Sequence, residues 1–196
     1  MKHLRHIFLP FIVLVAVAAS TVSCNTGDDE DTWKDYAEWR DINEQWIAEM
    51  EALRLPDGSP EYTRVVPVWN RNAYVLMKWF NDTMQTRDNL RPLYTSTVDV
   101  KYLGQRYDST PFDSSYVATT YGDSIFRTKA SAVITGWAIA LERMHVGDSV
   151  QVIIPYEQGY GATPVGKQGT SNFLRPYSAL QFFIKLVDIP AEYIRK

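Results

Sequence analysis

The sequence predicts an α+β fold: an antiparallel, curled β-sheet wrapped over one short helix, with an amphipathic helix added on the N-terminal side. Short apolar segments separated by polar turns are typical of strands, and they dominate the chain after residue 73. A single helical pattern, Gly136 to Met144, interrupts them. The 196 residues, 45% of them hydrophobic, are enough for one domain with a sizeable core and appendages.

Residues 1–23 are predicted to be a lipoprotein signal peptide. Lys2 and Arg5 are followed by an apolar run, residues 7–22, that is shorter than the roughly 20 residues of a membrane-spanning helix. The run ends in small residues before Cys24, the only cysteine. We therefore expect a lipid on Cys24 that anchors the protein to the outer membrane of the cell envelope, facing the periplasm or the surface. The alternative is an uncleaved membrane anchor.

Residues 24–31 form an acidic segment, which we interpret as a solvated tether because clustered like charges repel one another. The alternative is a sorting signal for export to the cell surface. Residues 32–72 are assigned to an N-terminal helix and a connector, and residues 73–196 to the main domain.

The N-terminal helix is predicted over residues 32–55, where the run Pro56 to Pro60 ends it. Its apolar side chains recur at helical spacing. They are Trp39, Ile42, Trp46, Met50 and Leu53. We expect this stripe to pack on the chain's own domain, since apolar stripes usually face a core. The alternatives are the seam of a homodimer and an arm that binds client proteins.

The strands of the main domain are predicted from alternation and from apolar runs. Their expected ranges are 73–80, 98–102, 125–129, 148–154 and 180–189, with a polar loop over 81–92. Gly147 is expected to end the short helix as a left-handed cap. Asp99 and Lys101 are interpreted as a solvated strand face.

The chemistry available to the mature chain is limited. Without the signal peptide, His145 is the only histidine, no free thiol remains beyond the lipid-bearing Cys24, and no cofactor or metal site is predicted. Cysteine nucleophiles and zinc sites built from His or Cys clusters are thereby excluded, and His145 is interpreted as an exposed turn residue without a companion acid. Without Lys2 and Arg5, 18 basic residues face 23 acidic ones, a net charge of −5 that argues against nucleic-acid binding.

Five motifs in order resemble the FKBP family of peptidyl-prolyl cis/trans isomerases. They are Tyr102-Leu103-Gly104, Phe112-Asp113-Ser114-Ser115, Val133-Ile134-x-Gly136-Trp137, Tyr160-Gly161 and Leu180-x-Phe182. The resemblance covers residues 73–190 and implies an FKBP-like fold whose site is an apolar aromatic pocket. It also implies that proline-containing segments of folding proteins are the partners, and that no cofactor is needed.

Carried over residue by residue, the resemblance implies a set of catalytic pocket residues. They are Tyr102, Phe112, Asp113, Val133, Ile134, Trp137, Tyr160 and Phe182. Trp137 is expected at the floor, the Ile134 N–H and the Tyr160 hydroxyl on substrate carbonyls, and Asp113 bonded to Tyr102. Phe126 and Leu174 are added as substrate-binding residues.

Two departures from the family pattern stand out. Ser124 replaces a ring on the strand before the motif, so we expect a thinner pocket wall, and the loop over 162–175 is long. The predicted function is proline isomerisation that assists the folding of exported proteins. The alternative is an FKBP-like chaperone or binding lipoprotein with little or no catalysis.

Overall fold

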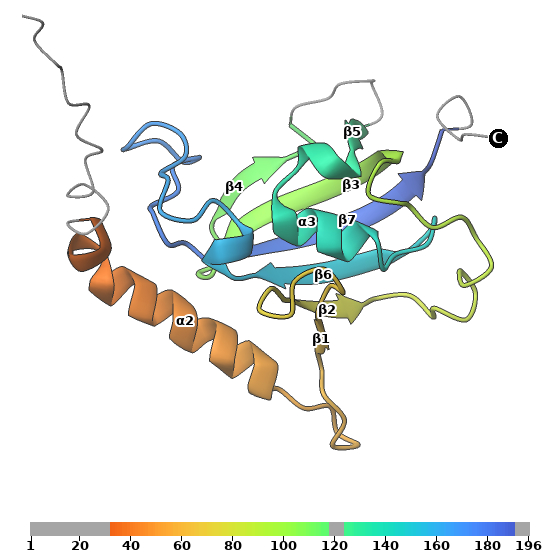
Figure 1. Ribbon diagram of the computed structural model, residues 1–196, viewed down its shortest axis with the longest axis horizontal. Coiled ribbons are helices and arrows are strands. Elements are labelled where there is room, and N and C mark those ends of the chain that lie inside the picture. The colour runs from red at the N-terminus through yellow and green to blue at the C-terminus, as the bar shows by residue number, and fades with distance from the viewer. Residues whose placement is uncertain (1–31, 118–123, 191–196) are drawn as a thin grey trace, which may run out of the picture.

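The computed structural model describes residues 32–117 and 124–190 (Figure 1). The α-helices with defined bounds in this part of the chain are α2 (Ala37–Ala52) and α3 (Thr135–Leu141), and a helical turn over residues 32–35 precedes α2. Two short 3-10 helices span Ala130–Ala132 and Tyr156–Gln158. The strands are β1 (Thr63–Val65), β2 (Val75–Trp79), β3 (Thr97–Arg106), β4 (Pro111–Ser114), β5 (Phe126–Lys129), β6 (Ser149–Ile154) and β7 (Leu180–Asp188). The predicted signal peptide, Cys24 and the acidic tether lie outside the described residues. Within the described part, no helix is both long and apolar enough to cross a bilayer.

The strands form one antiparallel sheet in the order β1-β2-β6-β7-β3-β4, and β5 also pairs with β3. The long β3 is central, since β4, β5 and β7 all pair with it. Figure 1 shows α3 lying across one face of this curled sheet. The predicted fold class is therefore confirmed. β1 and β4 were not predicted, because strands of three and four residues are too short to show alternation.

The main core lies between α3 and the sheet. The predicted face of the last strand, Leu180, Phe182, Ile184 and Leu186, is buried there together with Trp137. Gly136 brings α3 close to β6, because a Cβ at this position would collide with the Ile154 side chain. A larger residue would therefore lift the helix from the sheet and strain the core.

Helix α2 covers part of the opposite face of the sheet. Ile47 packs there with Leu76 of β2 and Ile153 of β6, whose neighbours Met77 and Val152 point to the α3 side. The Asn43 amide oxygen accepts a 2.9 Å hydrogen bond from the Ala179 N–H. These contacts place α2 on the chain's own domain, which is the arrangement the sequence favoured.

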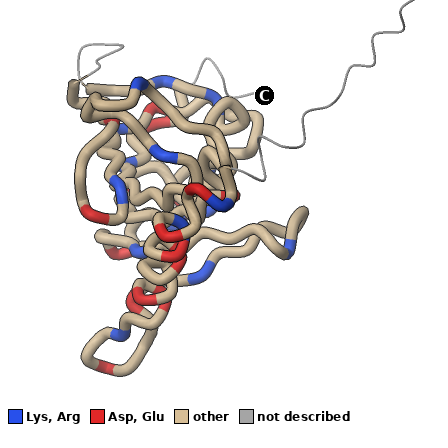
Figure 2. Tube along the Cα trace, turned by 90° about the vertical axis from the view of Figure 1, so that its left-hand side faces the viewer, with Lys and Arg blue, Asp and Glu red and all other residues tan. Residues whose placement is uncertain are grey.

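The predicted stripe on α2 is only partly right. Asn43 and Arg40 are buried, whereas Ile42 and Leu53 are exposed. Arg40 is buried because its guanidinium lies 3.4 Å from the centre of the Trp33 ring and donates to the Trp33 carbonyl. Acidic residues recur along α2 (Figure 2), where five of them accompany one arginine. A homodimer through α2 stays a prediction.

Asp99 does not lie on a solvated face, and that prediction was wrong. It is only 6% exposed, and its two carboxylate oxygens each lie 2.7 Å from a guanidinium nitrogen of Arg127. Asp99 and Arg127 are cross-strand partners in the β3–β5 register. A bidentate ion pair is one of the few ways to bury a carboxylate at low cost, which explains the position.

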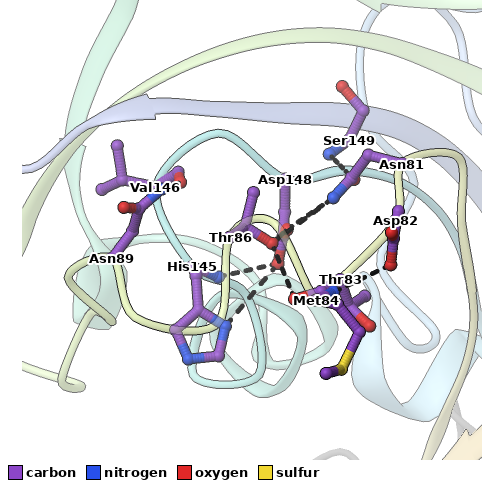
Figure 3. Close-up of polar contacts among 10 residues, drawn as sticks. All are labelled: Asn81, Asp82, Thr83, Met84, Thr86, Asn89, His145, Val146, Asp148 and Ser149. Carbon is purple, nitrogen blue, oxygen red and sulfur yellow. Dashed lines mark hydrogen bonds and ion pairs between the residues drawn. The ribbon is translucent and has the colours of Figure 1, made fainter.

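Asp148 is the hub of a buried polar network that ties the segment after β2 to the turn before β6 (Figure 3). Its carboxylate accepts hydrogen bonds from Asn81, from the Thr86 hydroxyl and from the His145 N–H. The His145 ring nitrogen Nδ1 lies 3.9 Å from the same carboxylate, so the interpretation of His145 as lacking a companion acid was wrong.

The short helix ends earlier than expected, at Leu141, and Gly147 does not cap it. Gly147 does adopt a left-handed φ of 99°, but it does so in the turn that leads into β6, where its N–H donates to the Leu186 carbonyl. The glycine signal was therefore interpreted correctly as a left-handed residue and assigned to the wrong turn.

The docking of α2 can be tested by replacing Asn43 with alanine. Asn43→Ala leaves the buried Ala179 N–H without its acceptor, so we expect a loss of about 1–3 kcal/mol in the free energy of unfolding. Denaturant unfolding of residues 25–196 measures it, and Gln45→Ala, on the exposed side of α2, is the matched control. An unchanged stability for Asn43→Ala would show that α2 does not dock on this domain in solution.

Candidate active site

A pocket of about 240 Å³ opens between α3 and the sheet. Its walls come from β3, β5, β7, the segment that enters α3 and the turn after β6. The residues that line it are Tyr102, Asp113, Phe126, Ala132, Val133, Ile134, Trp137, Tyr160 and Phe182. Seven of the eight predicted catalytic residues and Phe126 thus meet in one place, although they come from segments up to 80 positions apart.

The floor of the pocket is a cluster of rings around Trp137. The Trp137 ring contacts Tyr102 edge-to-face at 5.0 Å and Phe182 at 5.2 Å between ring centres. Phe126 contacts Tyr102 at 5.6 Å. Edge-to-face packing holds each ring in a defined orientation, so the cavity has a fixed shape. An apolar surface of this kind can bind a proline ring without a charged group.

Asp113 is positioned by the backbone of the β3–β4 hairpin. Its Oδ2 accepts a 2.8 Å hydrogen bond from the Tyr102 hydroxyl, and its Oδ1 accepts one from the Ser114 N–H. Burial first, and then the bond and charge of Asp113, raise the pKa of Tyr102 above its ordinary value. Tyr102 therefore stays a neutral donor, and Asp113 orients its ring.

Two polar groups stand at the edge of the apolar floor. The Tyr160 side chain is 37% exposed, and burial together with the charge of Asp113 raises the pKa of its hydroxyl. The Ile134 N–H, at the entry to α3, makes no hydrogen bond within residues 32–117 and 124–190. Both groups can therefore donate to a carbonyl of a bound peptide.

Two predicted residues do not line the pocket. Phe112 lies behind Phe182, in an edge-to-face contact at 5.5 Å, and both rings pack where Gly104 leaves room on β3. Leu174 is 1% exposed in the core, where its backbone pairs with Val165 and closes the loop over 162–175. Ala132 lines the pocket and was not predicted, because a small apolar residue carries no distinctive sequence signal.

The departure at Ser124 has a structural counterpart. Ser124 has a left-handed φ of 59° just before β5 and does not line the pocket. Phe126 supplies the ring from β5. The pocket wall therefore has one aromatic side chain at this strand.

Comparison with known proteins agrees with this geometry. Residues 90–187 match the FKBP-type peptidyl-prolyl cis-trans isomerase family. The chain belongs to this family. The predicted enzyme class, an FKBP-type peptidyl-prolyl cis-trans isomerase, is thereby confirmed. The match begins before β3 and ends within β7, so it contains every residue that lines the pocket.

Several characterised proteins are similar in sequence to this chain. A macrophage infectivity potentiator of Trypanosoma cruzi is 28% identical over 88% of this chain and 74% of its own length. The FKBP-type 22 kDa peptidyl-prolyl cis-trans isomerase of Escherichia coli is 34% identical over 50% of this chain, and the outer membrane protein MIP of Legionella longbeachae is 32% identical. The matched regions span only 43% and 39% of those last two proteins.

Solved structures share the fold. FkpA from Escherichia coli superposes with a TM-score of 0.62 over 81% of this chain and 62% of its own, at 20% identity. A peptidyl-prolyl cis-trans isomerase from Pseudomonas syringae pv. tomato gives a TM-score of 0.59 over 78% of this chain and 94% of its own, at 22% identity. At these identities the likeness is one of fold.

The raised pKa of Tyr102 predicts a specific pH dependence of stability. The folded protein keeps this proton above pH 10, where the unfolded chain releases it, so the stabilisation is complete below pH 10 and is lost as pH rises. Tyr102→Phe should therefore flatten the decline in unfolding free energy between pH 10 and 11 by up to about 1.4 kcal/mol. Denaturant titrations of both proteins at pH 7 measure the stability that Tyr102→Phe loses through packing. This loss is then subtracted from the difference at high pH. Equal slopes in both proteins would contradict the assignment.

Proposed function

We propose that this protein accelerates cis-trans exchange of X-Pro bonds in exported proteins by binding the proline segment in the pocket around Trp137. The observation that carries the proposal is the convergence of Tyr102, Phe182 and Phe126 near Trp137, with the free Ile134 N–H and the Tyr160 hydroxyl at the rim. An X-Pro segment offers a proline ring for the floor and carbonyl oxygens for the two donors.

The pocket can lower the barrier without acid–base chemistry. Rotation about a peptide bond faces a barrier of about 18–20 kcal/mol because resonance gives the C–N bond double-bond character. In the twisted transition state the resonance is lost and the amide is less charge-separated. An apolar pocket disfavours the planar amide and tolerates the twisted one, and each 1.36 kcal/mol of this difference gives about a tenfold rate increase.

The polar groups at the rim have a positioning role in this proposal. Hydrogen bonds from the Ile134 N–H and the Tyr160 hydroxyl would hold the carbonyls that flank the rotating bond, so that only one side of it turns. Asp113 holds the Tyr102 ring and keeps its hydroxyl engaged. The Tyr160 hydroxyl is protonated throughout the neutral range, as tyrosine ordinarily is, and its raised pKa extends this donor state to higher pH.

A second candidate function is a chaperone or binding protein with weak catalysis. The observation in its favour is the wall at β5, where Ser124 contributes no ring and Phe126 is the only aromatic residue. A more open pocket would bind proline segments and constrain the rotating bond less. The proposed occupants of the pocket are the same in both cases.

The activity of the pocket can be measured by exchange of a short peptide that contains Ala-Leu-Pro-Phe. Tyr160→Phe should lower kcat/KM about two- to tenfold through one lost hydrogen bond. Trp137→Ala should lower it by more than tenfold, because it removes the floor. Tyr116→Phe changes an exposed ring outside the pocket and is the matched control. Circular dichroism checks that each variant is folded.

The outcomes separate the two candidates. No acceleration by micromolar wild-type protein would exclude the enzyme proposal, and binding of the same peptide without acceleration would support the chaperone. Folded Trp137 and Tyr160 variants with full activity would show that the pocket is misplaced.

We also propose that the protein acts in the cell envelope, held to the outer membrane by a lipid on Cys24, so that its clients are exported proteins. The lipoprotein-like sequence around Cys24 supports this, as does the similarity to an outer membrane protein of Legionella longbeachae. Mass spectrometry of the protein expressed with its own N-terminus should find the chain starting at a diacylated Cys24, and Cys24→Ser should release it from membranes. An unmodified Cys24 in a membrane-bound protein would favour the uncleaved anchor.

A further inference from the structure

A second and larger cavity, of about 530 Å³, lies beside the pocket on the outer side of α3. We call it the Trp69–Tyr94 groove, after the two rings that line it. The other lining residues are Val133, Thr135, Ala138 and Glu142. The groove was not predicted from the sequence, because Trp69 and Tyr94 come from two distant segments, the connector before β2 and the segment before β3.

The groove adjoins the pocket. Val133 lines both cavities, so the two meet at this residue. At its other end the groove meets a smaller hollow, which also contains Trp69 and Glu142 and adds Val68 and Leu93. A polypeptide several residues long can therefore follow one path across these cavities.

The path is bordered by large apolar side chains that the fold leaves in water. Trp69 is 56% exposed and Tyr94 51%, while Leu93 and Val68 are more exposed still. None of them belongs to either core cluster of the described residues. Exposed aromatic residues gathered around a groove are typical of a surface that binds another chain, since burying them excludes water from apolar area.

The wall that carries Tyr94 is held in place before any ligand binds. The buried Asp148 network fixes Asn81 and Thr86 (Figure 3), and the Asn89 side chain donates to the Val146 carbonyl. The Val146 N–H donates to the Leu90 carbonyl at 2.9 Å. The segment between β2 and β3 is thereby attached to the turn that follows α3. A wall fixed in advance costs little ordering entropy on binding.

Glu142 supplies a polar anchor in the groove. Its side chain is half-buried, and within residues 32–117 and 124–190 it makes neither an ion pair nor a hydrogen bond. A half-buried carboxylate without a partner gains from an N–H donor brought by a ligand.

We propose that the Trp69–Tyr94 groove binds the client segment that flanks the X-Pro bond, with one large apolar side chain between Trp69 and Tyr94 and an N–H of that segment on Glu142. The inference rests on the proposed function, because the proline in the pocket places the segment over Val133. The groove would make the protein selective for prolines that have an apolar residue nearby in the sequence. Unfolded chains expose such segments.

The test is a binding measurement on a peptide series. The reference is a fluorescent 11-residue peptide with a central Leu-Pro and alanine or serine elsewhere, and each other member carries Leu at one flanking position. We expect one position to tighten binding about fivefold over the reference, the effect of partly burying one side chain. In the Trp69→Ala variant, the ratio of the affinity for the best Leu-substituted peptide to that for the reference should fall to about one. In the Glu142→Gln variant, the affinity for the same Leu-substituted peptide should drop severalfold.

Phe80→Ala is the matched control, since Phe80 is as exposed as Trp69 but stacks on Phe183, whose side chain points away from the pocket. It should keep the fivefold ratio. Equal affinity across the whole series, or a ratio that survives Trp69→Ala, overturns the inference. The readout is binding, so failure of the proposed catalysis appears separately as tight binding without acceleration of exchange.

Discussion

The contact between α3 and the sheet is the constraint on which the site depends. Gly136 has no side chain where β6 presents Ile154, so the helix lies directly on the strand and the next residue, Trp137, enters the core beside β3 and β7. Tyr102 and Phe182 then meet the indole edge-to-face. The same docking places Ile134, whose N–H makes no hydrogen bond within the described residues, in the lining of the pocket. One close approach therefore sets the floor, the walls and a polar donor together.

The sheet supports this arrangement from behind. Because side chains alternate along β2 and β6, Met77 and Val152 face α3 while Leu76 and Ile153 face α2. Helix α2 thus covers apolar surface on the back of the sheet, from β2 and β6 to Tyr107 after β3, whose ring contacts Trp39 and Trp46. The pocket lies on the other face, so the N-terminal helix supports the domain without blocking the site.

Two buried carboxylates near the site, Asp99 and Asp148, each accept several hydrogen bonds. Asp99 pairs with Arg127 where β3 meets β5, and Asp148 binds the segment after β2. A buried carboxylate is costly unless its lone pairs are filled, so these positions favour one arrangement of the strands and loops over others. The consequence is that both edges of the site, the β5 wall and the wall that carries Tyr94, are held by ion pairs or hydrogen bonds.

The sequence alone predicted the longer elements and the ring-bearing motifs, but not the short strands β1 and β4. The fold was predicted from local signals, such as the alternation along β3 and β7. Most pocket residues were predicted from the order of the motifs, including Gly136, which is a family signature. Only the tertiary structure decided the environment of Asp99, since its partner Arg127 lies 28 positions along the chain. His145 lies only three positions from Asp148, but packing of the segment after β2 buries that carboxylate beside it. The Trp69–Tyr94 groove belongs to the same class. Trp69 and Tyr94 line one groove only when the connector and the segment before β3 fold beside α3. This is a relation between distant segments that no local pattern encodes.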